Sequence, residues 1–355
     1  MRKPIVLFSI LTSVFLITSD SATEAQVLHW ETGQILPGTE NLTVGPAANF
    51  ARWNTPDRNL RFADFTNTVL TDALFRFSDL TQARFRSSDL TGAQFFSATL
   101  QDADFENAVV AHSNFSDTTA HGFTNAQLYS TSSYQTRTLP GIDLSQNTLI
   151  GWVFSNADLS GSRFFQADLS DANFANANLV ASDVSRANLS GVVLTNADLT
   201  DADMTASNYQ GANLTNAVIL RADFAGTSAG GLTPEQIYAT ASYKSGQLAG
   251  IDLQRNDLTG WDLSNQDLSE SDFTRSTLSN VNLTNSLIPL ATLEDTTSRG
   301  LVAEQIYATA SYRSASLPEV DFSKNNLSEW DFSNQDLTQS SFEESVLAGA
   351  VFRAA

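Results

Sequence analysis

Cysteine is absent from this 355-residue chain, and histidine occurs only three times. Without thiols the chain can form neither a disulfide bond nor a thiolate metal site, and its redox compartment cannot be inferred. Positive charge is also scarce, because 19 Lys and Arg stand against 39 Asp and Glu, for a formal net charge of −20. No basic stripe runs through the sequence, so binding to nucleic acid is disfavoured.

Motifs of common enzymes are missing as well. The sequence holds no HExxH, no glycine-rich phosphate loop and no GxSxG element. Carboxylates occur close together throughout, so a catalytic pair cannot be told from its background. We interpret His29, His112 and His121 as surface residues, although the last two could approach each other on neighbouring turns. We expect no enzymatic activity and no cofactor; a cleft with convergent polar groups would be needed to revive a catalytic function.

Apart from its N-terminus, the sequence lacks long apolar runs. Residues 1–4 carry positive charge, residues 5–17 are predominantly apolar, and a small residue, Ala25, follows. This pattern predicts a secretory signal peptide over residues 1–25, because the apolar run is too short to span a bilayer; a buried N-terminal strand is the alternative. We therefore expect a mature chain without a membrane span, exported to the periplasm, the cell envelope or the extracellular space.

What the sequence does contain is a repeat of five residues, clearest over residues 157–224. Each unit has a small residue, Asp or Asn, then Leu or Phe, and two mostly polar residues. A period of five fits neither the α-helix nor the β-strand. Self-similarity at a short, fixed period predicts a solenoid, in which each unit buries its apolar residue by stacking on the next turn.

The pattern A(D/N)LXX resembles that of the pentapeptide repeat family over most of the chain. The resemblance implies an all-β solenoid, a right-handed quadrilateral β-helix with four pentapeptides in each coil of twenty residues. The central Leu or Phe and the small residue two before it then point inward. Inserts of the kind LTPEQIYATASYKS (residues 232–245) are similar to those of secreted members of the family. The β-helix is predicted over residues 58–355.

Residues twenty apart should lie above one another at the strand spacing of about 4.8 Å. The first repeat block then stacks its phenylalanines on two opposite faces and mainly leucines on the other two. The two phenylalanine columns are Phe65, Phe85, Phe105 and Phe75, Phe95, Phe115. Residues 26–57 lack the period, and we predict that they form an N-terminal cap with Trp30, Phe50 and Trp53 as plugs of the open core.

Three passages near residues 121–134, 230–243 and 299–312 break the period, each adding nine residues to one coil. We expect a short helix in each. In the second, Thr233 is the predicted N-cap, Pro234 the first helical residue and Gln236 the partner in a capping box, with the helix ending near Thr240. Val302 replaces the cap residue in the third passage, so its helix should begin less firmly.

The spacing of the three passages predicts that their helices project from one face. They start at residues 123, 232 and 301, and both separations are whole coils plus the nine added residues. The helices should then lie roughly 24 and 14 Å apart. The expected interaction face consists of Gln127, Tyr129, Glu235, Gln236, Tyr238, Glu304, Gln305 and Tyr307.

An Asn and a Trp follow each passage where the plain repeat has Ala or Ser. The pairs are Asn147 and Trp152, Asn256 and Trp261, and Asn325 and Trp330. We interpret these side chains as fillers of a wider coil; the alternative is a Trp-lined groove for a ligand beside each helix, because Trp is common in both settings.

Three aspartates, Asp183, Asp203 and Asp223, stack at steps of twenty residues, with Arg163 one coil earlier. Like charges about 5 Å apart repel each other, and Ca²⁺ would relieve that repulsion through oxygen ligands. These residues are weak Ca²⁺ candidates. The alternative is a row of solvated, screened carboxylates supported by Arg163.

These observations favour an exported, non-catalytic scaffold or rod that contacts a protein partner through its helical inserts. The inserts could instead be inherited boundaries of duplicated units, without a partner. Some members of the family are acidic mimics of DNA that bind type II topoisomerases, and the charge and rod shape expected here would suit that role, but the export signal argues against it. The sequence stops in mid-coil after Phe352, so we expect either a homodimer through the C-terminal coil or a missing tail.

Overall fold

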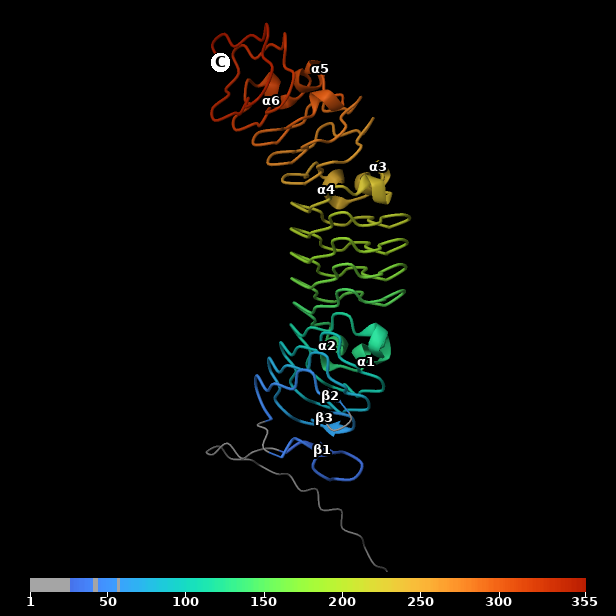
Figure 1. The fold of residues 1–355 in the computed structure, drawn as a ribbon. Helices are drawn as coiled ribbons and strands as arrows, with labels where there is room; N and C mark the ends of the chain where they lie inside the picture. The colour runs from blue at the N-terminus through green and yellow to red at the C-terminus, as the bar shows by residue number, and fades with distance from the viewer. Residues whose placement is uncertain (1–25, 41–43, 56–57) are drawn as a thin grey trace, which may run out of the picture.

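The computed structural model describes residues 26–40, 44–55 and 58–355 (Figure 1). The predicted signal peptide lies outside the described residues. The described chain is a stack of coils that runs from the N-terminal end to the C-terminal end of an elongated body, and the stack changes direction at α1–α2 and at α3–α4 (Figure 1). Within these ranges, no helix is long and apolar enough to cross a membrane.

The regular coil is held by single parallel bridges between residues twenty apart, such as those joining Asp64 to Arg84 and Arg84 to Asp104. Longer strands occur only near the N-terminus, within the described chain, and they pair antiparallel as β1 with β4 and β2 with β3. They are β1 (Leu28–His29), β2 (Asn54–Thr55), β3 (Arg58–Asn59) and β4 (Ala63–Asp64).

The geometry of one side of the coil explains the composition of the repeat. In the unit around Leu159, the Asp158 carboxylate accepts the N–H of Ser160 at 3.1 Å, which is a local turn that Asp and Asn favour. Gly161 then takes a φ of 64°, a left-handed conformation that glycine adopts without strain. Much of the negative charge therefore follows from a folding requirement of the turn.

The core consists of the predicted columns. Ring centroids of Phe65 and Phe85 lie 5.1 Å apart at an interplanar angle of 13°, and Phe85 stacks on Phe105 at the same distance. On the opposite face, Phe95 lies 5.0 Å from Phe75 and 4.8 Å from Phe115. All of these side chains are fully buried. The column prediction is confirmed, and each stacked pair adds about 0.5–1.5 kcal/mol beyond burial.

The segment before the repeats closes the core in part as expected. Phe50 and Trp53 are buried, and the Phe50 ring stacks on Phe75 at 5.3 Å. Trp30, however, is not a plug: its indole N–H donates to the carbonyl of Gln82 at 2.9 Å, and the Arg84 guanidinium lies 3.5 Å from its ring centroid. Because Arg84 occupies an outward-facing bridge position, Trp30 covers the outside of the rod instead of its open end.

Three coils have 29 residues, as the bridges from Asn114 to Asp143, Asp223 to Asp252 and Thr292 to Asp321 show. Each contains a 3₁₀ turn and two short α-helices, which we call a helical module. The first module has η1 (Thr119–His121), α1 (Asn125–Tyr129) and α2 (Ser132–Gln135). The second has η2 (Ser228–Gly230), α3 (Pro234–Tyr238) and α4 (Ala241–Lys244), and the third has η3 (Thr297–Arg299), α5 (Ala303–Tyr307) and α6 (Ala310–Arg313).

The second helix of each module was not expected. The first helix of the second module begins after Thr233, whose N–H donates to the Gln236 side chain at 2.8 Å, but it ends at Tyr238. Thr240 then caps α4, because its hydroxyl accepts the N–H of Tyr243 at 3.1 Å. Tyr243 therefore lies in a helix, whereas Leu248 returns to the buried column of the next coil.

Candidate interaction surface at the helical modules

Each module is attached to the preceding coil by a glutamine. The amide of Gln236 donates to the carbonyls of Tyr209 and Ala212 at 2.8 and 2.9 Å, and its oxygen accepts the N–H of Thr233. In a plain coil, the carbonyl at the place of Ala212 accepts a backbone N–H of the next turn, as that of Ala63 does from Arg84, whereas the Tyr209 carbonyl keeps its usual partner, the N–H of Ala212. The module has displaced that turn, and the side-chain amide replaces it. Gln127 and Gln305 make the corresponding contacts in the other two modules.

Two tyrosines attach each module to the following coil. In the first module, the Tyr129 hydroxyl accepts the N–H of Val153 at 2.6 Å, and the Tyr134 hydroxyl donates to the carbonyl of the same residue at 2.7 Å. Partial burial raises the pKa of Tyr129. The two later modules repeat the arrangement, with Tyr238 and Tyr243 at Asp262 and with Tyr307 and Tyr312 at Asp331.

The Asn that follows each module closes its entrance. Asn147 is buried; its amide donates to the carbonyls of Phe115 and Leu144, and its oxygen accepts the N–H groups of Thr118 and Thr119 at 2.8 Å each. Asn256 and Asn325 are also buried and bridge the corresponding backbone groups. All three asparagines are structural, as the filler interpretation predicted.

These contacts change the expected interaction face. The three glutamines and Tyr129, Tyr238 and Tyr307 direct their polar atoms to neighbouring coils, so these atoms are not offered to a partner. Of the residues expected there, Glu235 and Glu304 are the ones that are exposed. In the sequence, the same glutamine and both tyrosines recur in all three passages, which marks them as shared parts of the insert without showing what they contact.

The tryptophan that follows each module is buried, yet two of these three tryptophans also border a groove. Trp330 lines an open groove of about 750 Å³ with η3 and the start of α5, and Trp152 lines the corresponding groove of about 430 Å³ at η1 and α1. Filler and groove are therefore not exclusive alternatives, because the indoles of Trp152 and Trp330 are buried and still contribute to the groove lining.

The structure places the Ca²⁺ candidates in one column, with Asp183 bridged to Asp203, and Asp203 to Asp223. Asp183 and Asp203 each accept hydrogen bonds from the residue two positions on, and Asp223 accepts the N–H of Ala225 at 2.8 Å. In the described part of the chain, no group of three or more acidic or histidine side chains is arranged to hold a metal ion. Arg163 forms no ion pair with the described residues, so the support expected from it is missing.

The same column continues into a more buried pair. Burial is the main cause that raises the pKa of Asp223, and burial followed by repulsion from Asp223 and Asp272 raises the pKa of Asp252 to about 6. The Gln254 amide donates to both Asp252 and Asp272, at 2.7 and 2.9 Å. Neighbouring carboxylates are thus bridged by a side-chain amide.

The stacked coils and the five-residue turns agree with a family model for pentapeptide repeats, which matches residues 59–92, 88–122, 167–205, 197–229, 247–285 and 315–354. These ranges cover more than half of the chain. The chain belongs to the pentapeptide repeat family. No curated protein matches it in sequence.

Solved structures of other pentapeptide repeat proteins are similar. HetL from the cyanobacterium Nostoc, involved in heterocyst differentiation regulation, is 20% identical over 79% of this chain and 87% of its own, with a TM-score of 0.22. The plasmid-mediated fluoroquinolone resistance protein QnrB1 is 15% identical over 57% and 85%, with a TM-score of 0.20. A thylakoid lumen protein of Arabidopsis thaliana is 22% identical over 39% and 67%, with a TM-score of 0.18. These likenesses carry no inference about a partner or an activity.

Proposed function

We propose that this pentapeptide repeat protein is an exported, non-catalytic rod that binds protein partners along its three helical modules. The observation that carries the proposal is the repeated construction of the modules. Each has a 3₁₀ turn and two helices, and each is fixed by the same glutamine, asparagine and pair of tyrosines. The rod therefore presents the same fixed helix pair at three places along its length, which suits repeated contacts with a partner.

The proposal takes the coil as right-handed and the modules as facing one side. In support, a single unbroken column of bridges runs from Asn114 to Asp321, and every module is inserted directly after a residue of this column. In the view of Figure 1, α1 and α3 lie on the same edge of the rod. Coil counting then separates the modules by roughly 24 and 14 Å. Fixed separations favour a partner that engages more than one module, because the second contact is intramolecular.

Export is part of the same proposal and rests on residues 1–25. Mass spectrometry of the protein recovered from its host gives a direct measurement. We expect a mature N-terminus at or within a few residues of Gln26, in the envelope or the medium. Retention of the first 25 residues in a cytoplasmic protein would contradict export.

The docking role is tested by capture from a cell-envelope extract with a plain-coil variant. In this variant, the 29 residues 115–143, 224–252 and 293–321 are each replaced by a copy of residues 164–183, one plain coil. The Asn and Trp that follow each module are changed to Ala, as in the plain repeat. We expect partners of the natural rod to be lost by this variant.

A second variant sharpens the test. Deletion of residues 184–203 removes one plain coil between the first and second modules and leaves all three modules intact. A partner that spans these two modules should bind the shortened rod more weakly, whereas a partner of a single module should not respond. Equal capture by the natural rod and the plain-coil variant would refute docking at the modules.

A further inference from the structure

The groove at the third module, which we call the third groove, combines exposed apolar side chains with a largely buried tryptophan. Val302 lies at the start of α5 and is 48% exposed. Val346, which bridges to Asn326 one coil earlier, is 54% exposed. Both line the groove together with Trp330, which is only 7% exposed. The volume of about 750 Å³ is within the range of pockets that bind small molecules or a few residues of a peptide.

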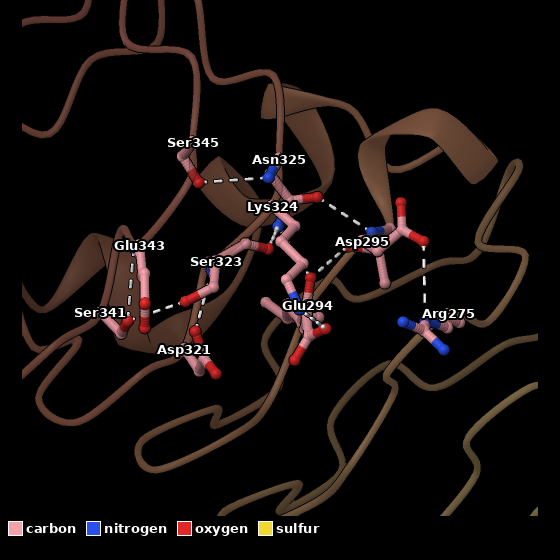
Figure 2. A network of polar contacts seen from close by, with 12 residues as sticks. Arg275, Glu294, Asp295, Asp321, Ser323, Lys324, Asn325, Ser341, Glu343 and Ser345 are labelled. Atoms are coloured by element: carbon pink, nitrogen blue, oxygen red, sulfur yellow. Dashed lines mark hydrogen bonds and ion pairs between the residues drawn. The ribbon is translucent and has the colours of Figure 1, made fainter.

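The rim of the third groove is negative. Glu304, Glu329 and Glu344 line it and are exposed, and none of the three forms an ion pair with the residues that the structure describes. The one positive side chain of the lining, Lys324, donates to Glu294 at 2.9 Å (Figure 2). Lys324 is also attracted to Glu344, but three glutamates against one lysine, itself paired with Glu294, leave the rim with an excess of negative charge.

The polar network of Figure 2 fixes the backbone behind this rim. Asn325 donates its N–H to Ser345 at 3.1 Å, and the hydroxyls of Ser323 and Ser341 lie 2.7 Å apart. Lys324 and Glu344 sit directly beside these pairs in the sequence, so their positions along the rod are fixed by neighbours that are hydrogen-bonded. The groove is therefore a preformed surface, which lowers the entropic cost of binding.

Comparison with the other modules shows that the coil does not demand these residues. The place of Val302 is taken by Thr124 and Thr233, and the place of Glu329 by Gly151 and Gly260. All three residues at the latter position have positive φ, 65°, 68° and 74°, a conformation that glycine adopts without strain and glutamate does not. The third module thus carries a less favourable residue that adds a charge to the rim.

We propose that the third groove binds a short segment of a protein partner in which an apolar side chain is flanked by lysine or arginine. The apolar side chain packs between Val302 and Val346 against Trp330, and the cations lie beside Glu304, Glu329 and Glu344. Complementary charge and exposed apolar side chains each favour this occupant. The lining of the first groove does not combine these two features. The proposal rests on the docking function and names the chemistry of one contact.

The probe is a synthetic pentapeptide with blocked ends, in which a central leucine is flanked by two lysines on each side, titrated into the full protein by calorimetry. A second peptide has glutamate for every lysine, and a third has serine for leucine. We expect binding of the first peptide that weakens with added salt, with at least fivefold weaker binding of the serine peptide and none of the glutamate peptide. Undetectable binding of the lysine peptide at millimolar concentration, or equal binding of all three, would overturn the proposal.

The matched variants take their residues from the first module. In the triple variant Val302→Thr, Glu329→Gly and Glu344→Gln, the new residues are those of Thr124, Gly151 and Gln166, so the coil should fold at least as well. The control is Glu319→Gly, which removes one exposed glutamate at φ 55° from another corner of the same coil, where the first two modules have Gly141 and Gly250. The triple variant should bind at least fivefold more weakly and the control within twofold of the natural protein.

An equal loss of peptide affinity in the triple variant and the control would assign the effect to the net charge of the protein. That result would refute binding in the third groove. The outcome is separable from that of the docking function. If module-dependent partners are captured while the lysine peptide fails to bind, the docking function stands and the proposed chemistry of the third groove falls.

Discussion

The hydroxyl of Tyr129 lies 2.6 Å from the backbone nitrogen of Val153 and accepts its hydrogen bond across 24 residues of sequence. Tyr134 approaches the same residue from the other helix of the module and donates to its carbonyl. A plain coil would satisfy both groups with backbone of the preceding turn. In the module, two tyrosine hydroxyls take over the hydrogen bonds that backbone groups would make in a plain coil. A helix pair can therefore be inserted without leaving the next coil unpaired at this residue.

The exchange Tyr129→Phe tests this relationship. It leaves the ring packed but removes the acceptor, so the Val153 N–H must turn to water. We expect a local loss of about 0.5–1.5 kcal/mol, because that is the usual net contribution of one hydrogen bond. Hydrogen–deuterium exchange should show faster exchange of the Val153 amide, with little change at coils far from the first module. Unaltered exchange at Val153 would show that the hydroxyl is dispensable.

Tyr209→Phe should have the opposite effect. Tyr209 is fully buried in the column that otherwise holds Leu or Phe, and burial is the main cause that raises its pKa well above the ordinary value. Among the residues that the structure describes, its hydroxyl meets only the carbonyl of Met204, at 3.5 Å, which is a poor hydrogen bond. Removing it should stabilise the rod or leave it unchanged, by about 0–2 kcal/mol. Thermal unfolding followed by circular dichroism measures the change, and a clear destabilisation would contradict it.

The contrast between these tyrosines shows where sequence reasoning ends. The columns of Phe65 and Phe75 could be predicted, because a fixed period assigns each residue to a face and burial follows from the face. The roles of Gln236 and Tyr238 could not, because they depend on which backbone groups the displaced turn leaves unpaired. The second helix was within reach, because Thr240, like Thr233, is a residue that favours the N-cap position.

Two adjacent residues of α3 give a further prediction. Gln236→Glu replaces an amide that donates to two carbonyls with a carboxylate that repels them. We expect a loss of about 2–4 kcal/mol at neutral pH, since two hydrogen bonds are removed, the Ala212 carbonyl loses its partner, and the new carboxylate is repelled by both carbonyls. Glu235→Gln, one residue earlier and exposed, should change stability by less than about 0.5 kcal/mol. Chemical denaturation of both variants measures the difference, and similar values would contradict the attachment role of Gln236.

The acidic column predicts a stability that depends on pH. Asp252 has a pKa of about 6 in the folded protein, above the ordinary value of 3.8, so between these values the folded state holds more protons than the unfolded state. Stability from this group is therefore present below about pH 4 and is lost as pH rises through about 6. Asp223 and Asp272 are the charged neighbours that repel it, and the Gln254 amide offsets part of that repulsion.

Asp252→Asn should stabilise the rod at pH 7.5 and not at pH 4. Asparagine mimics the protonated carboxyl, and elsewhere in the rod Asn178 and Asn188 donate to the aspartate one coil earlier at 2.9 Å. We expect a gain of about 1–2 kcal/mol at pH 7.5, less than the full pKa shift implies, because solvent screens a half-buried group. Asp257→Asn is the control. The side-chain and backbone hydrogen bonds of Thr259 lower the pKa of Asp257, so its stabilising contribution is present at neutral pH and is lost as pH falls. The control should therefore gain nothing at pH 7.5, and an equal gain in both variants would assign the effect to net charge instead of the buried column.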